Sequence, residues 1–433
     1  MNPALASLAA LLLAIALSFS SRLNVGLPAL ALAWLIGVFT PGAKPEALAA
    51  AFPASLFLTL LGVSLLFALA EANGTLVHLA EDATRLVGGD LRSVPWMLFL
   101  VAAAVSAIGP GAISSVALMA PLAAPIARRL GLPAFLTSLM VVNGANAANL
   151  SPLSAVGIIA NSRMAEAGLG GHEAKVFAAN FLAHLAVTLG AFAFWLWKDK
   201  AEAAARRSSG SPNEGPAPAT PNGATKGLPR SGFERCHALT LAVIALWMVS
   251  VIVWRLPVGY TALVAVVLLL ALRAGDEAAV LPRVPWAVLV MVCGMATLVS
   301  FVEKAGGLDL MSALIARLST PATVHGVVAF VTGVISTWSS TSGVVLPAFL
   351  PTVPSLVARL GGGDPLAVAL SINVGSSLVD VSPLSTLGAL CISALADPST
   401  ARHLFRQLMA WGLSMSVVGA LLCQLFAGPL ARL

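Results

Sequence analysis

The sequence predicts an all-α polytopic membrane protein, and three observations support this fold class. Hydrophobic residues make up 58% of the 433 residues, whereas Asp, Glu, Lys and Arg together make up only 10%. Soluble domains carry roughly 25% charged residues, so a water-exposed surface cannot be built from this composition. Apolar segments long enough to cross a bilayer recur along the chain, and one pattern appears in both halves. We therefore expect the lipid bilayer to surround most of the chain.

Eight segments are apolar over about the 20 residues that a helix needs to cross the hydrocarbon core. We expect each to form one continuous helix. They cover residues 4–20, 25–40, 52–72, 174–197, 237–254, 258–272, 285–303 and 404–427.

Two longer apolar stretches, 93–164 and 322–396, are interrupted by clusters of Gly, Pro, Ser and Asn. Backbone freed from helical hydrogen bonds inside a membrane must be covered by protein or line a wet cavity. Each stretch therefore predicts a re-entrant hairpin followed by one interrupted spanning helix. The hairpins are expected at about 93–127 and 322–357, and the interrupted helices at about 134–164 and 365–396.

The two halves of the chain carry copies of one pattern. GANAANLSPLSAVG begins at Gly144, and GSSLVDVSPLSTLG begins at Gly375, 231 positions later. Further matching landmarks are Gly26 with Gly259 and Gly62 with Gly294. Each half has five spans and one hairpin, and the odd number of spans makes the second copy enter the membrane in the opposite orientation. We therefore predict two inverted repeats, each with five transmembrane helices, one re-entrant hairpin and one interrupted helix.

A polar segment separates the two copies, which cover residues 1–198 and 236–433. Residues 199–235 are rich in Pro, Gly, Ser and charge, which predicts a flexible linker. With this linker in the cytoplasm, 16 of the 24 Lys and Arg residues lie inside and 8 lie outside. Cytoplasmic loops carry an excess of basic residues. We therefore expect a multi-pass protein of the bacterial inner membrane with a cytoplasmic linker and both termini outside.

The sequence does not support an enzyme or a nucleic-acid-binding protein. Its four cysteines show no CxxC pair and no His spacing that would hold a metal. It contains no Walker A loop, nucleophile elbow or HExxH motif. The net charge of +6 comes from basic residues that sit mostly in loops, where they set topology. We expect no catalytic residue and no cofactor other than a coupling ion.

The hairpin tips and the helix breaks form the candidate binding region, because inverted-repeat transporters bind substrate and ions at broken helices near the midplane. The tips at 106–115 and 335–343 offer hydroxyl and N–H groups that can hold a carboxylate. Pro152 and Pro383 cannot donate a helical hydrogen bond, so the helices must open beside them. Some of these polar residues could instead cap helix ends or pack. The candidate substrate-binding residues are Ser114, Ser115, Asn143, Asn146, Ser340, Thr341, Ser376, Ser377, Ser382 and Ser385.

Asp380 carries a charge, whereas its counterpart in the first copy, Asn149, is neutral. A carboxylate in the middle of a membrane costs roughly 2.5 to 3.5 kcal/mol, so it should be paired with a cation, a proton or a hydrogen-bond network. We expect the coupling ion near Asn149, Ser151, Asp380 and Thr386, and a sodium ion could bind at Asn149 and Asp380. A purely structural network at Asp380 and direct exchange of a cation remain open.

These features resemble a known family. The Ser/Thr-rich tips followed by SSVALMAPLAAP and TSGVVLPAFLP, and the Ser-Pro breaks after them, resemble the ion transporter superfamily, which includes the divalent anion:sodium symporters. NGANAANLSPLS is most similar to the malonate/dicarboxylate carrier branch, the MatC-like proteins. The tips carry Pro110-Gly111-Ala112 and Thr337-Trp338-Ser339 where the symporters carry Ser-Asn-Thr. The resemblance implies a homodimer in which early spans form a scaffold for a moving transport domain.

We therefore expect a secondary active transporter of small organic anions, coupled to sodium or protons and working by an elevator motion. C3 or C4 dicarboxylates such as malonate or succinate are the expected substrates. One alternative is a cation/proton antiporter of the same fold with Asp380 as the cation site. A second alternative is a membrane sensor or assembly subunit that transports nothing, although the doubled helix breaks argue against it.

Overall fold

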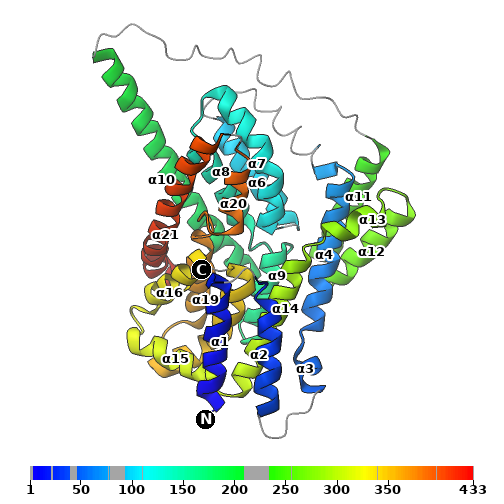
Figure 1. The fold of residues 1–433 in the computed structure, drawn as a ribbon, viewed down its shortest axis with the longest axis vertical. Coiled ribbons are helices and arrows are strands. Elements are labelled where there is room, and N and C mark those ends of the chain that lie inside the picture. The colour runs from blue at the N-terminus through cyan, green and yellow to red at the C-terminus, as the bar shows by residue number, and fades with distance from the viewer. Residues whose placement is uncertain are drawn as a thin grey trace.

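The computed structural model describes residues 3–20, 23–39, 46–76, 78, 93–109, 111–208, 234–254, 256–338, 340–395 and 397–432. All regular structure within these ranges is helical, which confirms the predicted all-α class (Figure 1). Six of the described helices are long and apolar enough to cross a membrane, judged by length and composition.

The eight continuous segments predicted from hydropathy are all helices. They are α1 (Pro3–Ser20), α2 (Gly26–Phe39), α4 (Ala54–Ala72), α10 (Glu173–Ser208), α11 (Arg235–Val253), α12 (Val258–Ala271), α14 (Trp286–Lys304) and α21 (Pro398–Arg432). Helix α10 extends into the segment predicted as linker, because residues 199–208 are mainly Ala, Glu and Arg, which favour helix. Residues 209–233 of the predicted linker lie outside the described residues.

Each interrupted stretch contains two arms and then two half-helices. The first comprises α6 (Ser93–Ile108), α7 (Gly111–Leu130), α8 (Ala134–Ala148) and α9 (Ala155–Glu166). The second comprises α16 (Val324–Trp338), η2 (Thr341–Val345), α17 (Leu346–Phe349), η3 (Leu350–Thr352), α18 (Val353–Leu360), α19 (Pro365–Leu378) and α20 (Thr386–Ser393). The second arm of each hairpin is itself long enough to cross a membrane. Whether the hairpins are re-entrant therefore stays a prediction.

Four short helices were not predicted: α3 (Glu46–Ala51), α13 (Glu277–Val280), η1 (Leu281–Arg283) and α15 (Gly307–Leu318). The longest of them, α15, buries Leu308, Met311 and Ile315 on one face and packs against α1. This spacing of apolar residues is that of an amphipathic helix. Its 12 residues are too few to span a bilayer, so hydropathy does not reveal it.

Two close crossings join helices from different halves of the chain: α2 packs against α14, and α4 packs against α12. A Cβ atom added at Gly294 would lie 2.3 Å from the carbonyl oxygen of Gly26. A Cβ atom added at Gly62 would lie 2.3 Å from the carbonyl oxygen of Gly259. Small residues let membrane helices approach this closely. Both crossings therefore use the glycines that recur in the sequence pattern.

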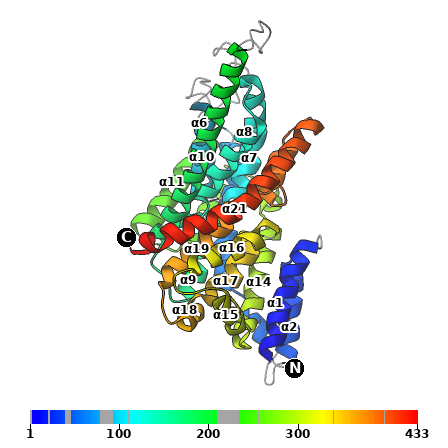
Figure 2. The same cartoon turned by 90° about the vertical axis from the view of Figure 1, so that its left-hand side faces the viewer.

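Two groups of helices lie on opposite sides of the molecule (Figure 1). Helices α4, α11, α12 and α13 gather on one side of the molecule, and α10 and α21 lie on the opposite side (Figure 1). Seen from that opposite side, α21 crosses α16 and α19, against both of which it packs (Figure 2).

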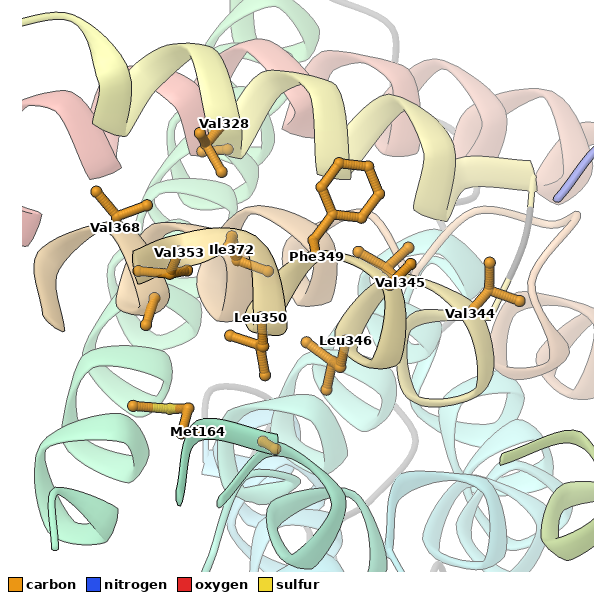
Figure 3. Packing of buried hydrophobic residues seen from close by; sticks show 14 of the residues in the cluster. Met164, Val328, Val344, Val345, Leu346, Phe349, Leu350, Val353, Val368 and Ile372 are labelled. Atoms are coloured by element: carbon orange, nitrogen blue, oxygen red, sulfur yellow. The ribbon is translucent and has the colours of Figure 1, made fainter. Parts of the chain in front are cut away.

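An apolar core holds the second hairpin against the second interrupted helix. Phe349 and Val353 of the hairpin belong to one buried cluster with Val328 of α16 and with Val368 and Ile372 of α19 (Figure 3). This packing holds both arms of the second hairpin against α19.

Candidate binding cavity between the hairpin tips and the helix breaks

A cavity of about 210 Å³ lies where the two hairpin tips and the two breaks meet. Ala112 and Ile113 line it from the first tip, and Ser342 lines it from the second. Six residues predicted as site residues also line it, from both breaks and the second tip: Asn149, Ser340, Thr341, Asp380, Ser385 and Thr386. Segments more than 200 residues apart in sequence therefore contribute to one cavity.

The first break is a compact turn closed by serine hydroxyls. Ser154 donates a hydrogen bond to the carbonyl oxygen of Asn149 and accepts one from the N–H of Gly157 at 3.0 Å. Ser151 accepts from the N–H of Leu153 at 3.3 Å. A Cβ atom at Gly157 would lie 1.9 Å from the carbonyl oxygen of Ser151, so the turn requires glycine there. These side chains replace the backbone hydrogen bonds that the helix loses at the break.

The second break repeats the same turn 231 positions later. Ser385 donates to the carbonyl oxygen of Asp380 and accepts from the N–H of Gly388 at 3.3 Å. Ser382 accepts from the N–H of Leu384 at 3.3 Å. A Cβ atom at Gly388 would lie 2.2 Å from the carbonyl oxygen of Ser382. The SPLS-x-x-G pattern in the sequence therefore encodes one local structure twice.

Asn149 and Asp380 each bind the hairpin tip of their own half. The side-chain oxygen of Asn149 accepts a hydrogen bond from the N–H of Ala112 at 3.0 Å. The carboxylate of Asp380 accepts from the Thr341 hydroxyl at 2.8 Å and from the Ser336 hydroxyl at 3.3 Å. Among the described residues, no salt bridge involves Asp380. Its charge is therefore met by hydroxyl groups in this structure.

Several predicted site residues do not reach the cavity wall. Ser115 donates to the carbonyl oxygen of Ala102 at 2.7 Å. Ser376 and Ser377 donate within their own helix, to the carbonyl oxygens of Ile372 and Asn373, both at 2.6 Å. Ser and Thr in membrane helices commonly bond the carbonyl one turn back. The other predicted residues that the structure does not bring to the cavity are Ser114, Asn143, Asn146, Ser151 and Ser382.

Two polar residues at the site were missed from the sequence. Ser336 lies on α16 before the second tip, and its hydroxyl lies 2.5 Å from that of Thr341. Ser342 follows Thr341 and lines the cavity. Both lie in the hydroxyl-rich run at 335–343, so the signal was present. The sequence alone does not show which members of the run face Asp380.

Comparisons with known proteins agree with this architecture. Residues 1–149 match a family described as the N-terminus of the dicarboxylate carrier protein MatC, which confirms the resemblance over that part of the chain. The crystal structure of the YdaH transporter of Alcanivorax borkumensis, described as having an unusual topology, has a TM-score of 0.55 and 15% identity. It covers 93% of this chain and 96% of its own, and at this identity the likeness shows the fold alone. No curated protein gives a significant match.

The chain therefore shares its fold with a solved transporter structure, and six of its described helices are long and apolar enough to cross a membrane. The match to the dicarboxylate carrier family covers the first 149 residues, about a third of the chain.

Proposed function

We propose that the protein is a secondary active transporter of small organic anions, with C3 or C4 dicarboxylates such as malonate or succinate as substrates. The observation that carries this proposal is the cavity that both hairpin tips and both breaks line. Its volume of about 210 Å³ is below the 300–1,000 Å³ typical of drug-sized ligand sites, which suits a small substrate. The family match over residues 1–149 supports the dicarboxylate class.

The cavity can attract an anion without Lys or Arg. Val156, in the first turn of α9, lines it, and so do Thr386 and Leu387, in the first turn of α20. The N-terminus of a helix carries a partial positive charge and unpaired N–H groups. Ser340 and Ser342 add hydroxyl groups from the second tip. We infer that one substrate carboxylate is held between these helix ends and the hydroxyls.

The negative charges of the substrate and of Asp380 require that a cation bind together with the substrate. A dicarboxylate that enters the cavity meets Asp380, and like charges repel strongly in a medium of low dielectric constant. A sodium ion or a proton that binds with the substrate offsets this repulsion. We assign the ion to the region of Asn149, Ser151, Asp380 and Thr386, with Asp380 as its charged ligand.

We further propose that transport uses an elevator motion in a homodimer of the inner membrane, with the linker cytoplasmic and both termini outside. The matched turns at the two breaks support a common origin of the halves. Cysteines placed at Ser114 and Ser340, in a variant without the four native cysteines, test the orientation. Impermeant reagents should reach the two positions from opposite sides of the membrane. Access to both from one side only would contradict the inverted arrangement.

Purified protein in liposomes tests the function. Uptake of labelled malonate or succinate should rise with an inward sodium or proton gradient, and substrate exchange should occur without a gradient. Protein-free liposomes are the control. Folded protein that neither takes up nor exchanges any dicarboxylate would contradict the proposal. Cation-driven proton movement without a dicarboxylate would instead favour the antiporter, which the carboxylate of Asp380 also allows because it forms no ion pair within the described part of the chain.

A further inference from the structure

Helix α10 carries three polar side chains that take no part in the cavity. Asn180, His184 and Thr188 lie four residues apart, so they share one face of the helix, and each has 0% exposure. Leu182 and Leu189, on other faces of the helix, are about half exposed. Buried polar groups at membrane depth are costly unless they find partners. The polar face therefore needs a structural or functional reason.

Asn180 binds the open end of α8. Its amide nitrogen donates to the carbonyl oxygen of Asn146 at 2.6 Å and to that of Ala147 at 3.2 Å. These carbonyls belong to the last turn of α8, which ends at Ala148, and the last carbonyls of a helix lack full sets of backbone donors. The break leaves these carbonyls without the backbone N–H donors of a continuing helix, and Asn180 supplies a donor from α10 instead.

The end of α8 that Asn180 contacts lies next to the cavity. Asn149 caps α8, lines the cavity and accepts a hydrogen bond from Ala112 of the first tip at 3.0 Å. Only two residues separate Asn149 from Asn146, so a shift of the last turn moves Asn149 with it. The contact between the first break and the first tip therefore depends on the α8 end staying in place.

The same turn also bonds to the second break. The amide nitrogen of Asn146 donates to the carbonyl oxygen of Ser377 at 3.4 Å. Ser377 is the counterpart of Asn146 in the second copy. His184, one turn after Asn180, bonds through Nδ1 with the carbonyl of Asn180 at 2.9 Å, and α10 packs against both α8 and α19. Helix α10 therefore packs against the helices that lead into both breaks.

Helix α21 of the second half carries no amide or imidazole side chain at the positions equivalent to Asn180 and His184. The positions 231 residues after Asn180 and His184 are Trp411 and Met415 on α21. Among the described residues the buried indole N–H of Trp411 has no hydrogen-bond partner, and Met415 is apolar. The second break is held by its own hairpin, where the Thr341 hydroxyl donates to the Asp380 carboxylate at 2.8 Å. Asn180 is therefore not a general requirement of the repeated fold.

We propose that Asn180 is a positioning residue for the cavity: it holds the open end of α8 so that Asn149 stays against the first hairpin tip and Asn146 stays against the second break. This role rests on the proposed transport function. It acts on the geometry of the substrate site, so its loss should change apparent affinity more than the amount of folded protein.

Asn180→Leu tests the role, because Leu is close in size but has no donor. In liposomes, normalised to folded protein, the apparent KM for the dicarboxylate should rise about tenfold, as expected for the loss of one buried hydrogen-bonding group. Asn180→Ser keeps one donor on a shorter side chain and should give a smaller rise. Thr188→Val is the matched control: it lies on the same buried face, and its hydroxyl bonds only its own helix, at the carbonyl of His184. It should leave KM within about twofold.

The outcomes separate this inference from the proposed function. Absence of dicarboxylate transport by the wild-type protein would overturn the function itself. With wild-type transport present, an unchanged KM in Asn180→Leu, or an equal rise in Thr188→Val, would overturn the positioning role. Failure of both Asn180 variants to fold would also overturn it, since the residue would then serve folding rather than the site.

Discussion

The two helix breaks share a turn but are anchored differently. In both, a serine closes the turn and a glycine lets it pass close to a carbonyl. The first break is neutral and is held by the amide of Asn180 from α10. The second carries Asp380 and is held by two hydroxyls of its own hairpin. The difference teaches that one local turn can serve both breaks while the groups that anchor each break differ in chemistry.

Asp380→Asn should produce the largest functional change and tests the charged half of this comparison. The amide keeps the size of the carboxylate but removes the charge that a coupling cation needs. We expect gradient-driven uptake to fall at least tenfold while substrate exchange survives. Gradient-driven uptake and exchange are measured side by side in liposomes. Wild-type behaviour in both assays would remove Asp380 from the mechanism and make the breaks functionally alike.

Gly157→Ala and Gly388→Ala test whether the two turns are structurally equal. Each added methyl would collide with a backbone carbonyl, at 1.9 Å and 2.2 Å respectively. We expect each to destabilise the protein by about 1–3 kcal/mol, as overpacking does. Thermal unfolding in detergent measures this, and Gly190→Ala, where nothing lies within 4 Å, is the matched control. A large loss of stability in one variant and none in the other would show that the two turns are not structurally equivalent.

Thr341→Val should have a smaller effect, confined to the second break. It removes the hydroxyl that donates to Asp380 at 2.8 Å while keeping the shape of the side chain. We expect the apparent affinity for the coupling ion to fall about tenfold with folding preserved. Thr332→Val on α16 is the control, because its buried hydroxyl bonds its own helix, at the carbonyl of Val328. An equal loss of ion affinity in the two variants would show that the hydrogen bond from Thr341 to Asp380 has no particular role in binding the ion.

The sequence predicted the fold and part of the site for identifiable reasons. Hydropathy located the long helices, and Pro152 and Pro383 located the breaks, because both signals are local. Asn149 and Asp380 were found because the repeat aligns them. Their contacts with Ala112 and Thr341 depend on packing between distant segments, which no local signal encodes.

Ser377 and Asn180 show what local sequence signals leave out. Ser377 was expected in the cavity, but its hydroxyl bonds Asn373 one turn back, and the sequence does not tell which way a helical residue faces. Asn180 was missed because it is a single amide in an apolar helix without a counterpart in the second half. Its partners on α8 lie more than 30 residues away.

The glycine crossings have a consequence for how the chain is made. Helix α2 finds its partner surface on α14, about 265 residues later in the chain, and α4 finds its own on α12, about 200 residues later. At synthesis rates of about 5–20 residues per second, α2 waits roughly 13–53 s before that partner exists. During this interval the glycine faces of the first half have only lipid or chaperones to cover them. The first half therefore cannot complete these two crossings before α12 and α14 are made, and we expect quality-control proteases to degrade it whenever translation stops at the linker.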